Sequence, residues 1–194
     1  MTTLIVQRNA TDQWLRLVSE AEHAAHCQLD QDVESYLVFL LIRYTNQPEI
    51  AGSVLALEYL RNMMMGGNLR RQGLRDVGDK CLLYSGLFPR RADRRRVRIS
   101  YFVDLGRSAY SQLADNVSEE AAVMYRCLAK GFISVMDVLH KMRELGDPNA
   151  RLAPLHAYEL WADTGSVRAY HSLREFTRAE SLLPTQNTET KSKQ

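Results

Sequence analysis

The sequence of 194 residues is poor in cysteine, in proline and in lysine. Its three cysteines, Cys27, Cys81 and Cys127, are separated by 54 and 46 residues. This spacing contains no C-x-x-C pair of a structural zinc site, and an odd number does not suit a disulfide scaffold. We therefore expect free thiols in a reducing compartment.

Long apolar runs are also missing. The longest run, at 36–42, has seven residues, whereas about 20 are needed to span a bilayer. Residues 1–7 lack the basic start and the long apolar stretch of a signal peptide. The sequence predicts a soluble, cytoplasmic protein that does not contact a membrane.

Recognisable catalytic and cofactor motifs are absent as well. The chain has no G-x-S-x-G, protein-kinase or dinucleotide fingerprint. The Glu-x-x-His pair typical of di-iron bundles occurs once, at Glu20 and His23, and is not repeated. We expect no metal and no cofactor, and we favour a protein that is not an enzyme.

The net positive charge of the chain is small, but arginine is concentrated in one segment. The chain has 25 Lys and Arg against 23 Asp and Glu, a smaller excess than nucleic-acid-binding domains usually carry. Arginine provides 20 of the basic residues, and a window of nine residues would hold about one by chance. The window 90–98 holds six. They are Arg90, Arg91, Arg94, Arg95, Arg96 and Arg98.

Helical periodicity runs through almost the whole chain. Apolar residues recur over 121–142 at alternating spacings of four and three, which is typical of one helix face. The longest alternating, strand-like pattern covers only 96–100. We predict an all-α, single-domain bundle of about seven to eight helices over 1–183, with the apolar segment 36–42 as its central helix. A disordered polar tail is expected over 184–194.

Local signals predict where several helices begin. Asp30 or Asp32 can cap the second helix, Asn68 the fourth and Ser166 the last, because their side chains can accept hydrogen bonds from free backbone N–H groups. One long helix is expected from Ser118 to the Gly-Asp-Pro sequence that follows residue 145.

The arginine-rich segment 90–98 raises a conflict with a helix predicted at about 100–115. If that helix extended back through the segment, five of the arginines would fall within about 140° of arc. That arc overlaps the apolar face that carries Phe102, Ala109 and Leu113. Buried guanidinium groups need partners, so two solutions remain. We favour a chain break near 97–100 that exposes the arginines; the alternative is a pocket in which carboxylates or a phosphorylated ligand neutralise them.

Carboxylates that could serve such a pocket lie on both sides of the segment. Asp76 and Asp79 share one helix face and precede the arginines closely enough to be their intramolecular partners. Asp104 lies one turn from Arg107. The complete set of pocket or ion-pair candidates is Arg75, Asp76, Asp79, Tyr101, Asp104, Arg107 and Tyr110.

Residues 74–113 also contain a pattern of glycines and aromatic residues. Its residues are Val77-Gly78-Asp79, Leu82, Gly86-x-Phe88, Tyr101-Phe102 and Gly106-x-x-Ala109-Tyr110. The pattern resembles one found in a group of uncharacterised bacterial proteins and covers about a fifth of the chain. The resemblance implies a bacterial cytosolic setting and no particular activity.

These observations favour a non-enzymatic binding, regulatory or adaptor protein that docks an anion at 90–98. The expected partner is an acidic protein surface or a phosphorylated ligand; nucleic acid is disfavoured because no nucleic-acid-binding signature accompanies the segment. One alternative is an enzyme or ligand-binding protein that holds a phosphorylated or carboxylated small molecule near Asp76, Asp79, Tyr101 and Asp104. Another is an assembly protein that forms a homodimer through an exposed apolar stripe.

Overall fold

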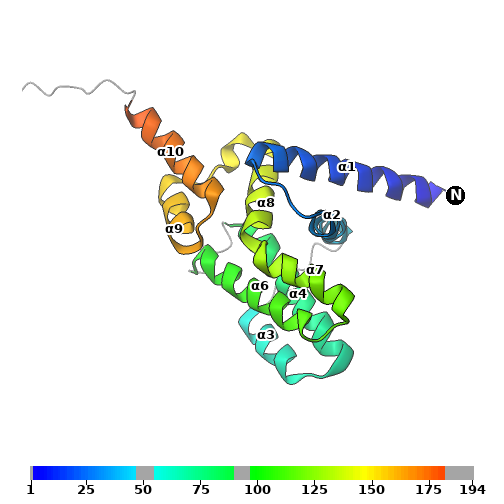
Figure 1. The fold of residues 1–194 in the computed structure, drawn as a ribbon. Helices are drawn as coiled ribbons and strands as arrows, with labels where there is room; N and C mark the ends of the chain where they lie inside the picture. The colour runs from blue at the N-terminus through cyan, green and yellow to red at the C-terminus, as the bar shows by residue number, and fades with distance from the viewer. Residues whose placement is uncertain (1, 47–54, 90–96, 182–194) are drawn as a thin grey trace, which may run out of the picture.

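The computed structural model describes residues 2–46, 55–89 and 97–181, which form helices and contain no strand (Figure 1). The all-α prediction is confirmed. In chain order the elements are α1 (Thr2–Ala25), α2 (Gln31–Asn46), α3 (Leu55–Met64), α4 (Gly67–Gly86), α6 (Ile99–Ala114), α7 (Glu119–Lys130), α8 (Phe132–Gly146), the short 3-10 helix η2 (Pro148–Ala150), α9 (Pro154–Thr164) and α10 (Val167–Ser181).

Helix α4 forms the centre of the bundle and packs against α3, α6 and α8. Every residue from 81 to 86 in its second half is buried. Small residues permit this packing, because a Cβ atom on Gly78 would come within 2.6 Å of the Tyr110 ring. A Cβ atom on Gly106 in α6 would come within 2.5 Å of Phe132. The two glycines therefore let the neighbouring helices approach closely.

The apolar helix α2 is not the central helix, so that prediction is wrong. It buries Leu37 and Leu41, but Phe39 is 65% exposed. Its main neighbour is α1, with a smaller contact to α7. An apolar run predicts burial only on the faces that neighbouring helices cover, and one face of α2 is left open.

The sequence signals for helix ends had mixed outcomes. The Asp30 carboxylate accepts a hydrogen bond from the Asp32 N–H, and Ser166 Oγ accepts one from the Ala169 N–H at 3.0 Å, so both caps are confirmed. The predicted cap at Asn68 is wrong. Helix α4 begins at Gly67 and its N-cap position is Gly66; Gly67 adopts a φ of +57°, which glycine tolerates and most residues avoid.

The long helix predicted from residue 118 onward is two helices. Gly131 separates α7 from α8, and its φ and ψ of −84° and 8° are not helical. The apolar stripe nevertheless continues across the break, since Leu128, Phe132 and Val135 are all buried. Periodicity therefore identified the buried face but not the change of direction.

Helices α9 and α10 form a hairpin at the side of the bundle opposite the free end of α1 (Figure 1). Pro154 starts α9, and Gly165 ends it in a left-handed conformation with φ of +73°. The predicted tail at 184–194 lies outside the described residues. Within the described ranges, no helix is both long and apolar enough to cross a membrane.

Candidate functional site

The arginine-rich segment is described at its C-terminal end, where Val97 and Arg98 precede α6. Arg98 is extended, with φ of −74° and ψ of 155°, and α6 begins at Ile99. The helix therefore does not extend back through Arg98. This agrees with the chain break near 97–100 that we favoured from the sequence. The other five candidate arginines, Arg90, Arg91, Arg94, Arg95 and Arg96, lie outside the described residues.

Arg98 contacts α9 through one surface carboxylate. Its Nη1 atom donates to both Asp163 oxygens, at 3.2 and 3.3 Å, and Ser100 Oγ donates to Asp163 Oδ2 at 2.9 Å. The Arg98 side chain is 67% exposed and that of Asp163 is 24% exposed. A pair so open to water adds little stability, and most of the guanidinium surface stays accessible to solvent.

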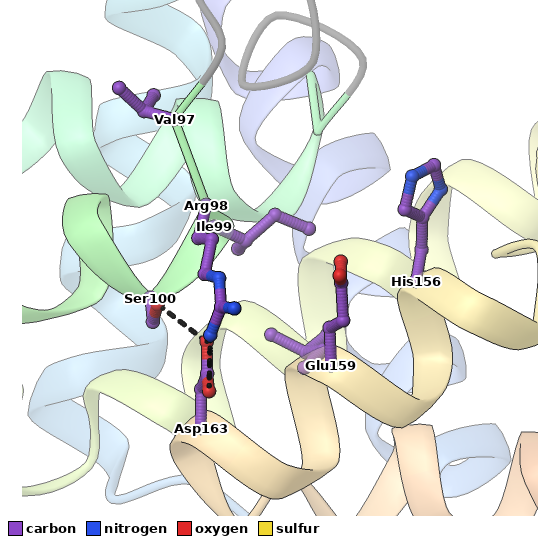
Figure 2. Close-up of a pocket in the computed structure, with 8 residues that line it drawn as sticks. Val97, Arg98, Ile99, Ser100, His156, Glu159 and Asp163 are labelled. Carbon is purple, nitrogen blue, oxygen red and sulfur yellow. Dashed lines mark hydrogen bonds and ion pairs between the residues drawn. The ribbon is translucent and has the colours of Figure 1, made fainter.

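A small cavity of about 70 Å³ lies at this junction of α6 and α9. Figure 2 shows the Glu159 side chain rising from α9 between Arg98 and His156. Val97, Ile99 and Leu160 contribute apolar surface to the same cavity. The cavity marks the place where Arg98, at the end of the arginine-rich segment, meets α9.

The other predicted residues do not form one site, although three of them do come together. Asp79 is buried and accepts hydrogen bonds on Oδ1 from Tyr110 OH at 2.8 Å and from Tyr36 OH at 2.5 Å. Arg43 Nη2 donates to Asp79 Oδ2 at 2.7 Å and to Asp76 Oδ1 at 3.3 Å. Helices α2, α4 and α6 thus meet at one carboxylate, which we call the Asp79 cluster: Tyr36, Arg43, Asp76, Asp79 and Tyr110.

Burial dominates the electrostatics of the Asp79 cluster. It raises the pKa of Asp79 above its ordinary value, although Arg43 and the two phenols act in the opposite direction. It also raises the pKa values of Tyr36 and Tyr110 well above 10, so both phenols keep their protons and act as hydrogen-bond donors to Asp79. Three donors engage the two carboxylate oxygens. The cluster is therefore an internal network in which Asp79 already has its partners.

The other four predicted residues are not members of the Asp79 cluster. Arg75 approaches Asp76 at 4.0 Å and is partly exposed. Arg107 Nε donates to the Ala129 carbonyl at 3.1 Å and so links α6 to α7. Tyr101 and Asp104 are exposed and lie about 180° and 120° around α6 from Tyr110. The expectation that Asp79 and Asp76 neutralise the arginine-rich segment concerns arginines of which five lie outside the described residues. Among the described contacts, Arg43 is the closest cation to both carboxylates.

The sequence interpretation missed two members of the Asp79 cluster, Tyr36 and Arg43. Both come from α2, where they are seven positions apart and therefore lie within about 20° of each other on one face. That spacing was the available signal. It was overlooked because Tyr36 was counted as part of the apolar run 36–42 and Arg43, directly after the run, was not considered.

A second buried polar group joins the α9–α10 hairpin to α8. Ser166 Oγ donates to Asp137 Oδ1 at 2.6 Å, and Arg168 pairs with Glu144. Nearby, His140 is fully buried and its Nε2 contacts the Ser85 carbonyl at 2.7 Å. Burial lowers the pKa of His140 to about 3, so it is neutral at neutral pH, when its Nε2–H donates to that carbonyl.

The described part of the chain contains no group of three or more His, Cys, Asp or Glu side chains arranged to hold a metal ion. All three cysteines are free thiols. Comparisons with protein-family models, with curated proteins and with solved structures gave no match. The functional interpretation therefore depends on the geometry described above.

Proposed function

We propose that this protein is a non-enzymatic binding protein, of the adaptor or regulatory kind, that docks an anionic partner through the arginine-rich segment 90–98. The observation that carries the proposal is the start of α6 at Ile99, directly after an extended and largely exposed Arg98. A segment that leaves the helix at this point need not place its arginines along the apolar face of α6.

The use of the neighbouring carboxylates supports the same proposal. Among the described contacts, Asp79 and Asp76 of α4 pair with Arg43 of α2. Asp163 and Glu159 of α9 lie at the end of the segment, and Asp163 is already shared by Arg98 and Ser100. Arg98 keeps most of its guanidinium surface exposed beside this shared carboxylate, which favours contact with an external anion.

The chemistry of the guanidinium group defines the class of partner. Its planar donors match a carboxylate or a phosphate, so the partner is an acidic protein surface or a phosphorylated ligand. The alternative ligand site within the bundle has weaker support, because Tyr101 and Asp104 lie on other faces of α6 than Tyr110. The homodimer alternative rests on exposed apolar residues alone.

Binding of two labelled polyanions to the full-length chain tests the proposal. Inorganic polyphosphate represents the phosphorylated partner and poly-L-glutamate the acidic protein surface. We expect binding of at least one probe at low salt, with an affinity that falls linearly on a log–log plot against salt concentration. Fluorescence anisotropy at several salt concentrations measures both the affinity and this slope.

A matched pair of variants separates a local site from net charge. The first replaces Arg90, Arg91, Arg94 and Arg95 with Gln. The second replaces four exposed arginines elsewhere, Arg16, Arg61, Arg71 and Arg151, with Gln. Both lose the same charge, but we expect the first to weaken binding at least tenfold and to reduce the salt slope by about one per lost contact. Equal losses in both variants, or no binding by the wild-type chain, would reject the proposal.

A further inference from the structure

The α9–α10 hairpin carries an exposed aromatic strip made of Tyr158, Trp161 and Tyr170. The ring centroids of Tyr158 and Trp161 are 6.1 Å apart, and those of Trp161 and Tyr170 are 5.6 Å apart. The three residues are 54%, 39% and 40% exposed. The rings thus form one continuous surface that crosses from α9 to α10.

The strip is held on a firm support. Ser166 and the Arg168 backbone N–H both donate to Asp137 of α8, and Arg168 pairs with Glu144. On the other side of the hairpin, Asp163 binds Arg98 and Ser100 of α6. These contacts fix the hairpin from the faces opposite the rings, so the strip is pre-organised and its exposure is a stable property of the fold.

Arg174 places a positive charge beside the strip. The guanidinium carbon of Arg174 lies 5.9 Å from the centre of the Tyr170 ring, over its face. Among the described residues, no carboxylate forms an ion pair with Arg174. Trp, Tyr and Arg are enriched among the residues that contribute most to binding energy at protein interfaces. A partner that carries a carboxylate would supply the acid that Arg174 lacks among the described residues.

The size of the strip indicates the size of what covers it. Aromatic side chains present roughly 150–250 Å² each, so the exposed parts of these three amount to about 270 Å². A standard protein interface buries about 800 Å² on each side. The strip is therefore too small to hold two copies of the chain together, and it matches the contact area of a short peptide segment.

We propose that the aromatic strip, together with Arg174, binds a short acidic peptide segment of a partner protein. An apolar or aromatic side chain of the peptide packs against Trp161, and a carboxylate of the peptide pairs with Arg174. The site lies on the face of α9 opposite the one that contacts Arg98, so it is separate from the arginine-rich segment 90–98. The proposal holds or fails independently of the function proposed above.

Selection from a random 12-residue peptide library displayed on phage, with the full-length chain as bait, tests the proposal. A parallel selection uses Trp161→Ala. We expect peptides enriched only on the wild-type chain, with an Asp or Glu close to an aromatic or leucine residue. The leading peptide is then synthesised with a fluorescent label and used as the probe. We expect Trp161→Ala and Tyr158→Ala each to weaken its binding at least tenfold.

The charge requirement has its own variants. We expect Arg174→Gln to weaken binding of the peptide about fivefold and Arg174→Lys to retain most of the binding. A probe in which the acids are changed to amides should bind the wild-type chain and both variants equally. Phe39→Ala removes a more exposed ring on α2 and is expected to change nothing. The proposal is overturned if no peptide is enriched over the Trp161→Ala selection, or if the enriched peptides lack acids. The proposal is also overturned if the wild-type chain self-associates, binds oligo(dT) or binds phosphatidylserine vesicles and Trp161→Ala abolishes that binding.

Discussion

Two pairs of arginine and aspartate in this protein have the same chemistry and different surroundings. Arg43 of α2 and Asp79 of α4 meet at 2.7 Å in the interior of the bundle, and the Asp79 side chain is 1% exposed. Arg98 and Asp163 meet at 3.2 Å at the surface, where the Arg98 side chain is 67% exposed. In the first pair the carboxylate also binds two tyrosines; in the second it also binds one serine.

The comparison teaches that burial decides what such a pair can do. A buried carboxylate that loses its partners cannot turn to water, so the fold depends on them. A surface pair exchanges its partners for water at little cost. The Asp79 cluster therefore belongs to the stability of the bundle, whereas Arg98 remains available to another anion.

The largest expected effect is that of Asp79→Ala. The substitution leaves two buried phenols without their acceptor and Arg43 without its closest acid, and breaking a buried pair costs about 3–5 kcal/mol. We expect the free energy of unfolding to fall by that amount in urea denaturation. Asp76→Ala is the control, since Asp76 is 44% exposed and contacts Arg43 at 3.3 Å, and it should cost less than about 1 kcal/mol. Similar losses in both would show that burial is not the deciding variable.

His140, which is buried but belongs to neither Arg–Asp pair, tests the effect of burial separately. His140 has a pKa lowered to about 3 by burial and by the nearby Arg168 and Arg143, whereas its ordinary value is 6.5. Between these two values the unfolded chain binds the proton and the folded chain does not. Protonation therefore favours unfolding, and the His140 contribution to stability is complete above pH 6.5 and is lost progressively as the pH falls towards 3.

The measurement compares wild-type protein with His140→Gln in urea at pH 7, 6, 5 and 4. We expect the wild-type free energy of unfolding to fall by up to about 1.4 kcal/mol per pH unit relative to the variant below pH 6. Asp79 and Asp137, whose pKa values burial raises, act with the opposite sign and cancel because both proteins contain them. Parallel curves would mean that His140 reaches water in the folded state.

The fold was largely accessible from the sequence because it depends on periodicity. Helical spacing identified the helices and the buried face of α7 and α8, and short-range signals placed the caps at Asp30 and Ser166. The break at Gly131 was missed because a stripe of apolar residues is the same on both sides of a bend. The central position of α4 was missed because its glycines lower its apolarity while they permit close packing.

The candidate site was less accessible because it depends on partners far apart in the chain. Asp79 and Tyr110 were identified as candidates, and their hydrogen bond spans 31 residues. Arg43, the closest cation to Asp79, lies 36 residues away on a helix that was read as apolar. Spacing within one helix shows which residues share a face, but not which helix covers that face.

The smallest expected effect belongs to the surface pair. Asp163→Asn removes the carboxylate from Arg98 and leaves a side chain that can still accept from Ser100, so we expect a loss below about 1 kcal/mol in urea denaturation.

Polyphosphate binding by Asp163→Asn should strengthen about twofold, because a unit charge at roughly 8 Å in water contributes ~0.5 kcal/mol. Glu175→Gln on α10 is the control of equal charge, and we expect a smaller gain from it because the carboxylate that pairs with Arg98, the described end of the segment, is Asp163. If polyphosphate affinity rose equally in both variants, the Arg98–Asp163 pair would be weaker than the buried pair but would not compete with the docked anion. A gain confined to Asp163→Asn would mean that α9 competes with the partner for Arg98, which a weak and exposed pair can do and the Asp79 cluster cannot.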